Sequence, residues 1–231
     1  MNYLLYCVFS TLDEPGKAAV LGVGGEPVFY IAHGGLSAAV SQINSQEAIP
    51  DIPRICAYNQ VVTYFHNNRA VIPMRYGSLF AQEAQVVRFL EAHSEQFKSL
   101  IQKLTGCEEM GIRLLLPNAP RVKKENPRSE TTYSSGHAYL AAKRQHYQQE
   151  EPLAHERDLL VKTVCHKLSE FFVHSKQEFC VSEDKRIISL YFLVPGNSVE
   201  RFCHAARQIK LQASGELLLS GPWPPYNFVQ I

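Results

Sequence analysis

The sequence lacks several features that define common classes of protein. Among its 231 residues no apolar run reaches the roughly 18–20 residues needed to cross a bilayer, so we expect no membrane-spanning helix. Residues 1–10 are apolar, but they have neither a basic start nor a small-residue cleavage site, and they indicate a strand rather than a signal peptide. These absences favour a protein of the cytoplasm.

An excess of charge of one sign is also missing. The formal net charge is +1, from 23 Lys and Arg against 22 Asp and Glu, so no overall field attracts nucleic acid or anionic lipid. The 6 cysteines form no Cys-x-x-Cys pair, and a chain of this length without a secretory signal usually keeps its thiols free. We therefore expect no nucleic acid, no membrane and no disulfide framework.

Residue patterns for catalysis or metal binding are absent too. Cys165-His166 and Cys203-His204 are sequence neighbours whose side chains point in different directions, and no His-x-x-x-His occurs. Glu108-Glu109, which follows Gly106, is more typical of a solvated turn than of a general acid–base pair. The sequence predicts no catalytic residue, no metal and no cofactor.

The first half of the chain carries a regular succession of strand and helix patterns. Apolar or alternating runs predict strands over residues 3–9, 28–31, 36–43, 70–76 and 110–116. Apolar residues at helical spacing predict one helix over 55–65 and another, as a continuous stripe, within 81–104. This order predicts an α+β domain over residues 1–117, a ferredoxin-like layer of two helices on one mixed sheet.

The second half predicts a separate, smaller α+β domain over residues 136–231. Residues 118–135 are rich in proline and polar side chains and are interpreted as a linker or loop. After them we expect a long helix over 136–174, interrupted near Pro152, then a hairpin ending at residue 194. A helix from about residue 199 and a strand over 216–219 follow, and the chain ends in an ordered tail.

Two segments do not fit this succession of strands and helices. In the first, Pro73 and Arg75 interrupt an apolar run, and because proline cannot donate to a sheet, the strand is expected at an edge or at a bulge. The second ends the chain, where Pro222, Pro224 and Pro225 hold the backbone extended around large aromatic side chains. This proline–aromatic tail is either a clasp that pins the C-terminus onto its own domain or a docking surface, and residue chemistry leaves both open.

These two segments resemble the signatures of the gas vesicle GvpF/GvpL family, somewhat more closely GvpF. The matching residues are Pro73, Met74, Arg75, Tyr76 and Gly77 in the middle of the chain and Trp223, Pro224, Pro225 and Tyr226 at its end. The resemblance implies a protein of gas-vesicle biogenesis that is located at the gas vesicle within the cytoplasm. It would be a minor structural component or an assembly factor, not an enzyme, and its partners would be the hydrophobic shell protein and other gas-vesicle accessory proteins.

On this hypothesis the nine signature residues are the candidate partner-binding residues. An aggregation-prone shell subunit needs its apolar surface or strand edges covered, and an edge strand with an aromatic tail is suited to that. The alternative is a small-molecule sensor or an enzyme on a ferredoxin-like scaffold, with Arg75 holding an anionic ligand in a cleft between domains.

Overall fold

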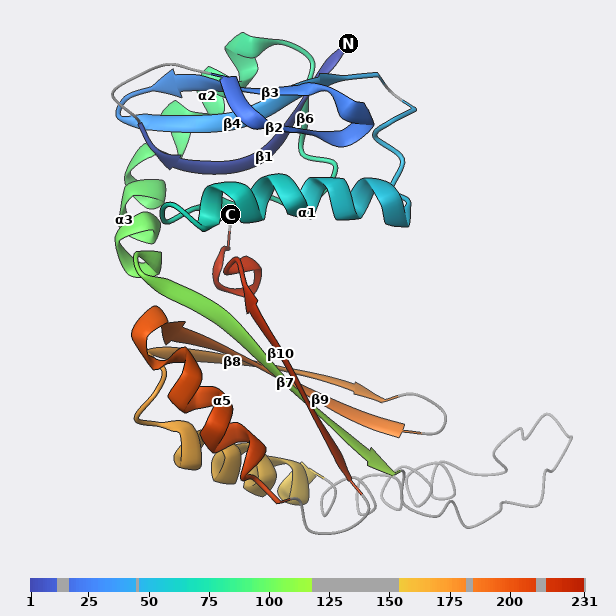
Figure 1. The fold of residues 1–231 in the computed structure, drawn as a ribbon, viewed down its shortest axis with the longest axis vertical. Coiled ribbons are helices and arrows are strands. Elements are labelled where there is room, and N and C mark those ends of the chain that lie inside the picture. The colour runs from blue at the N-terminus through green and yellow to red at the C-terminus, as the bar shows by residue number, and fades with distance from the viewer. Residues whose placement is uncertain (12–16, 45, 118–153, 182–184, 211–214, 231) are drawn as a thin grey trace, which may run out of the picture.

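The protein is an α+β molecule with two separate sheets (Figure 1). The structure is a computed structural model, and it describes residues 1–231 except 12–16, 45, 118–153, 182–184, 211–214 and 231. In Figure 1 the N-terminal sheet lies at the top, the C-terminal sheet below it, and the chain passes from one to the other through α3 and β7. Within these described residues, no helix is both long and apolar enough to span a bilayer.

The N-terminal sheet has the strand order β2-β3-β4-β1-β5, and β6 also pairs with β1. Every pairing is antiparallel, which corrects the expected mixed sheet. The strands are β1 (Asn2–Ser10), β2 (Lys17–Leu21), β3 (Pro27–His33), β4 (Leu36–Ile43), β5 (Ile72–Pro73) and β6 (Leu79–Phe80). The short 3-10 turn Val23–Gly25 links β2 to β3.

Helices cover both faces of this sheet, so the predicted placement of two helices on one face is wrong. Helix α1 (Ile52–His66) packs Tyr58, Val61 and Phe65 on one face. Helices α2 (Glu83–Ala92) and α3 (Ser94–Leu104) pack on the other. Asp51 caps α1, since its side chain accepts a hydrogen bond from the Arg54 amide at 2.8 Å. The spacing of apolar residues identified the buried side of each helix, but it carries no information on which face of the sheet that side would meet.

Strand β1 supplies apolar side chains to both of these cores. Its pairing with β4 shifts between Leu5 and Cys7, which is a β-bulge. Because the bulge inserts an extra residue, Tyr6 and Cys7 both point toward α1, whereas Leu5 and Val8 point toward α2 and α3. The fully buried β1 agrees with the near-continuous apolar run from which it was predicted.

Two predicted elements of the first half are shorter than expected. The strand expected over 70–76 is reduced to β5, because Pro73 lacks an amide donor and the chain turns after Met74. The helix expected within 81–104 is two helices that meet at His93, whose φ of −108° and ψ of 11° are not helical. The rings of Phe89, His93 and Phe97 nevertheless pack together, which explains why the apolar stripe continues across the break.

The C-terminal sheet has the strand order β10-β7-β9-β8 and is antiparallel. Its strands are β7 (Cys107–Pro117), β8 (His174–Val181), β9 (Lys185–Pro195) and β10 (Glu216–Trp223). A helix whose described part covers residues 154–168 and helix α5 (Val199–Arg207), which follows the 3-10 turn Gly196–Ser198, pack on one face of this sheet. Figure 1 shows both helices below the sheet, on the side away from α1.

Strand β7 belongs to this second sheet, which corrects its expected place in the first. It pairs with β9 along all 11 of its residues and with β10 on its other side. The division into domains of residues 1–117 and 136–231 stays a prediction, and the pairing of β7 places residues 107–117 with the C-terminal strands. The predicted linker over 118–135 and the first part of the helix expected over 136–174 lie outside the described residues.

Candidate functional site

The proline–aromatic tail crosses from the C-terminal sheet to the helices of the N-terminal sheet. After β10 ends at Trp223, a 3-10 turn over Tyr226–Phe228 lies beside α1 and α3 (Figure 1). Gly221 makes the approach possible, because its φ is +108° and a Cβ there would lie 2.7 Å from the Glu109 carbonyl oxygen. The tail therefore packs on the other half of the molecule, so the first of the two alternatives, a clasp that pins the tail onto its own domain, is wrong.

A buried carboxylate anchors the tail at the start of β7. Glu109 is 4% exposed, and it accepts hydrogen bonds from the Asn227 amide at 2.8 Å and from Asn227 Nδ2 at 2.6 Å. Burial raises the pKa of Glu109, while the two bonds from Asn227 and the charge of Lys176 act in the opposite direction. The expected solvated turn at Glu108-Glu109 is wrong, because both carboxylates are engaged within the structure.

Glu108 makes a second tie between the two halves. Its Oε2 lies 2.6 Å from His66 Nε2 at the end of α1, and the His66 side chain is only 7% exposed. Because neighbouring residues of a strand point in opposite directions, Glu108 reaches α1 while Glu109 reaches the tail. The two adjacent carboxylates thus hold α1 and the tail at the junction, the place where the N-terminal and C-terminal halves meet.

The rest of the tail contacts α1, α3 and both cores of the N-terminal half. The Tyr226 hydroxyl donates to Asn59 Oδ1 on α1 at 3.1 Å, and Gln96 Nε2 on α3 donates to the Gln230 carbonyl at 2.9 Å. Tyr226 packs against the core under α1, and Phe228 and Val229 against the core under α2 and α3. Burial raises the pKa of Tyr226 well above its ordinary value. The tail is therefore a structural bridge.

Two of the central signature residues, Met74 and Tyr76, contact Tyr58 of α1. The Tyr58 hydroxyl lies within hydrogen-bond distance of the carbonyl oxygens of Leu5, Tyr6 and Met74, at 3.0, 3.1 and 2.9 Å. The Tyr76 ring packs edge-on against Tyr58, with centroids 5.3 Å apart. This cluster joins α1 to the bulge of β1 and to the chain after β5.

Most of the nine signature residues thus contribute to the packing or the turns of the fold, and two of those with large side chains, Arg75 and Trp223, are exposed. Pro73 and Met74 are buried, and Gly77 allows the turn after Tyr76 with a φ of +89°. Pro224 and Pro225 start the bridge, while Tyr76 and Tyr226 pack against the same core. Arg75 is exposed: its carbonyl accepts hydrogen bonds from the Ser78 amide and hydroxyl, but its guanidinium has no hydrogen-bond or ion-pair partner among the described residues. Trp223 is 46% exposed.

Trp223 lies at a surface hollow of about 300 Å³ on the open face of the C-terminal sheet. Side chains of three strands and of the tail line it: Glu109, Gly111, Arg113, Tyr191, Ser220, Trp223, Tyr226 and Asn227. Arg75 is not among them, so the structure does not bring the two exposed signature residues together at this hollow. Sequence reasoning missed Arg113 and Tyr191, which are separated from the signature blocks along the chain and share only a sheet face with Trp223.

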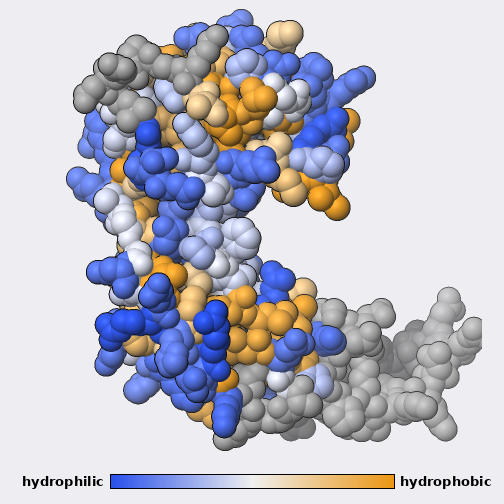
Figure 2. Space-filling view, viewed as in Figure 1, coloured by the Kyte–Doolittle hydropathy of each residue, from blue (hydrophilic) through white to orange (hydrophobic). Residues whose placement is uncertain are grey.

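Elements that border the gap between the sheets carry exposed apolar side chains in both halves of the molecule. Figure 2 shows this side of the molecule hollowed between the upper and lower halves, with apolar surface on the lower half facing the hollow. On the C-terminal sheet, Leu218 is 43% exposed. Around the start of α1, which lies on the open side of the molecule in Figure 1, Ile49, Ile52 and Ile55 are 64%, 79% and 47% exposed.

The described residues contain no group of three or more His, Cys, Asp or Glu side chains that could hold a metal ion. Burial raises the pKa of Cys7 and Cys107, so these two thiols are poor nucleophiles. The contacts at the junction serve to hold chain segments together. Fold and site together define an α+β protein of two sheets that is bridged by its own C-terminal tail.

The chain belongs to the GvpL/GvpF family of gas vesicle synthesis proteins, whose family model matches residues 2–230. Gas vesicle protein F1 of Halobacterium salinarum is 24% identical over 225 residues, which cover 95% of this chain and 87% of the relative. Gas vesicle protein L of a Streptomyces species is 23% identical over 260 residues, covering 98% and 92%. The resemblance read from the two signature blocks is confirmed, and F and L proteins match at nearly equal identity.

Solved structures agree with the fold. GvpF from Anabaena sp. superposes with a TM-score of 0.76 at 18% identity, covering 100% of this chain and 96% of that one. GvpF from Microcystis aeruginosa gives the same TM-score at 16% identity, with 100% and 99% covered. The chain therefore has the fold of these gas vesicle proteins along its whole length.

Proposed function

We propose that this protein binds the hydrophobic shell protein during gas-vesicle formation and limits its aggregation. Family membership supports a role in gas-vesicle formation, and the relatives carry the names of gas vesicle proteins rather than of enzymes. The observation that supports the finer proposal is the hollow between the sheets, which is bordered by β10 and by the start of α1, both of which carry exposed apolar side chains. Exposed apolar surface of this kind marks sites of protein–protein contact.

The contact surface would be formed by Trp223 and Leu218 on β10 and by the isoleucines at the start of α1. A large aromatic ring at the centre of an interface, with apolar neighbours that exclude water, is typical of the residues that dominate binding energy. Arg75, exposed at the turn after β5, would act at the rim of this interface and influence association more than affinity. The protein would accordingly be located at the gas vesicle within the cytoplasm.

Co-expression and pull-down with the shell protein test this proposal. We expect the wild type to retain the shell protein, Trp223→Ala to lose most of it, and Arg75→Ala to retain a reduced amount. Leu159→Ala is the control for a lost exposed apolar side chain, since Leu159 is 60% exposed on the helix side of the C-terminal half. Arg88→Ala, on the exposed side of α2, is the control for a lost arginine.

Two outcomes would count against the proposal in different ways. If the wild type retains no shell protein, binding itself is refuted. If the wild type binds and both Trp223→Ala and Arg75→Ala bind equally well while folded, the assignment of the contact surface is wrong. Light scattering of the shell protein alone and with the wild type measures the second part of the proposal, and unchanged aggregation would remove it.

A further inference from the structure

Strand β8 is an open edge of the C-terminal sheet among the described strands. Among the described strands it pairs with β9 alone, in a regular register along all 8 of its residues. Apart from half-buried Lys176, the residues from His174 to Cys180 are exposed. Such an edge presents a row of backbone amides and carbonyls that can pair with a further strand.

The other sheet edges carry features that block strand addition. Edge strands β5 and β6 have only 2 residues each, and β5 contains Pro73. Strand β10 contains Pro222 and shifts register between Ser220 and Trp223. Strand β2 has 5 residues and an irregular register with β3. Proline, bulges, short length and charged side chains protect edge strands, and of these β8 has only the charged side chains of Lys176 and Glu178.

The sequence of β8 is self-complementary in one antiparallel register. In an antiparallel pair, facing residues turn their backbone groups the same way, so two copies of β8 can be related by a twofold axis that passes through a residue. With the axis at Gln177, Lys176 of each copy faces Glu178 of the other, and residues 174–180 are paired. Shifting the axis to Lys176 or to Glu178 would place two like charges opposite each other, which is destabilising.

We propose that β8 pairs with β8 of a second copy of this chain, antiparallel about a twofold axis at Gln177. The two sheets then form one continuous sheet of eight strands, and each interface carries two Lys176–Glu178 pairs. Both charged side chains lie on the open face: Lys176 Nζ is 5.8 Å from the centroid of the Phe228 ring, and Glu178 accepts a hydrogen bond from the Tyr191 hydroxyl at 3.0 Å.

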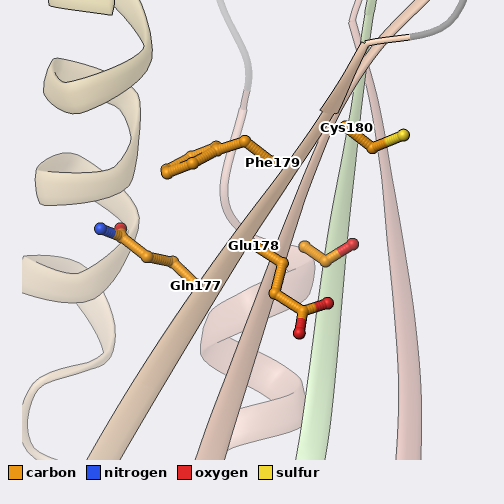
Figure 3. A pocket seen from close by; sticks show the side chains of 5 residues that line it. Gln177, Glu178, Phe179 and Cys180 are labelled. Atoms are coloured by element: carbon orange, nitrogen blue, oxygen red, sulfur yellow. The ribbon is translucent and has the colours of Figure 1, made fainter.

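The remaining residues of β8 fit the same register. On the helix side, Phe179, which is 41% exposed beside Arg157, would face Ser175 of the other copy and lose part of its contact with water. On the open side, His174 would face Cys180. Figure 3 shows Gln177 and Phe179 directed toward the helix, and Glu178 and Cys180 directed to the opposite side. A shallow hollow of about 370 Å³ is lined by side chains of both faces of this strand, in keeping with an edge that no described strand covers.

Charge-reversal variants of the full chain test the pairing and its register together. Glu178→Lys gives a strand with two lysines, and Lys176→Glu gives one with two glutamates, so neither should pair with itself. Mixed in equal amounts, the two variants place every lysine opposite a glutamate and should associate as the wild type does. The measurement is sedimentation equilibrium over a concentration series, with circular dichroism as the check of folding.

We expect the wild type to reach twice its chain mass of 26.1 kDa at high concentration. Each single variant should weaken association by at least about tenfold, since two attractive pairs become two repulsive ones. The charge reversal Glu91→Lys, on the exposed side of α2, should leave association unchanged. A wild type that stays monomeric throughout, or a mixture that fails to associate, overturns the proposal.

A cross-link at the axis gives a second, independent measurement. In this register the two Gln177 side chains face each other, and the Cβ atoms of directly opposed residues lie about 4.5–5.5 Å apart. With the exposed Cys56 and Cys180 replaced by serine, Gln177→Cys should form a covalent dimer under mild oxidation, whereas Ser175→Cys, whose partner is Phe179, should not. Equal cross-linking at both positions would overturn the register.

Discussion

The two sheets of this protein differ in how their faces are covered. The N-terminal sheet lies between α1 on one side and α2 and α3 on the other, and β1 is buried through both of its faces. The described helices of the C-terminal half cover one face of its sheet, and the other face carries polar and half-buried side chains such as Arg113, Ser189 and Tyr191. From this difference we infer that the N-terminal sheet serves as a scaffold, whereas the C-terminal sheet has one face and one edge that no described helix or strand covers.

The two sheets should differ most in the unfolding free energy that is lost when one aromatic side chain is removed from each. Phe65→Ala removes a ring that is 1% exposed and stacks on Phe9 with centroids 5.0 Å apart, so we expect a loss of about 3–5 kcal/mol of unfolding free energy. Tyr191→Ala on the open face of the second sheet should cost far less, about 1 kcal/mol or below. Urea denaturation measures both, and equal losses would contradict the scaffold interpretation.

Breaking the bridge between the sheets should have the next largest effect. Asn227→Ala removes the side-chain hydrogen bond from Asn227 Nδ2 to the buried Glu109 carboxylate and leaves the bond from the backbone amide, which should cost about 1–3 kcal/mol. Amide hydrogen exchange should show that the loss is concentrated at the tail and the start of β7, with the centre of β1 unaffected. Gln208→Ala, which removes an exposed amide elsewhere, is a matched control, and a uniform loss of protection in both would refute a local bridge.

A smaller loss of stability is expected from removing one hydrogen bond between the tail and α1. Tyr226→Phe keeps the ring in its core but removes the hydrogen bond to Asn59, and we expect a loss of about 0.5–1.5 kcal/mol. Tyr3→Phe, which removes an exposed hydroxyl contact with Gln42 within the first sheet, should cost less. Thermal unfolding of the two variants side by side decides whether the contact between the halves is the stronger one.

The smallest effect is a pH dependence that arises at the junction. Because burial raises the pKa of Glu109, the folded state holds its proton more tightly than the unfolded state does. Stability should therefore fall as the pH rises from the ordinary carboxyl value through the folded-state pKa, and it should be recovered on acidification. Glu109→Gln removes this contribution, so the difference in unfolding free energy between wild type and variant should favour the wild type increasingly as the pH is lowered. A difference that stays constant with pH would contradict the raised pKa.

Local patterns in the sequence predicted the elements well, but they did not predict the partners of those elements. The apolar run of β1 and the spacing in α1 mark buried surfaces directly, and both elements were found where expected. Strand β7 also has the expected strand pattern, but its sheet is decided by pairing with β9 and β10, whose residues lie about 70–120 positions further along the chain. No local pattern carries that information.

The candidate site was predicted only in part, for the same reason. Trp223 and Tyr226 were recognised by residue type and by the family resemblance, which the comparisons confirm. Glu109 was interpreted as solvated because its burial depends on Asn227, 118 residues away. The exposed face that joins Arg113 and Tyr191 to Trp223 exists only once three strands are aligned.

The bridging tail also sets an order of events during synthesis of the protein. The N-terminal sheet and its three helices consist of residues 2–104, so this half can fold while the ribosome is still making the rest. The contacts of Tyr226 with Asn59 and of Gln230 with Gln96 span 167 and 134 residues, and they close only after every strand of the second sheet has emerged. Until then the two halves are held together without the tail, by β7 and by contacts such as that of Glu108 with His66, so the tail is the last tie across the hollow to form.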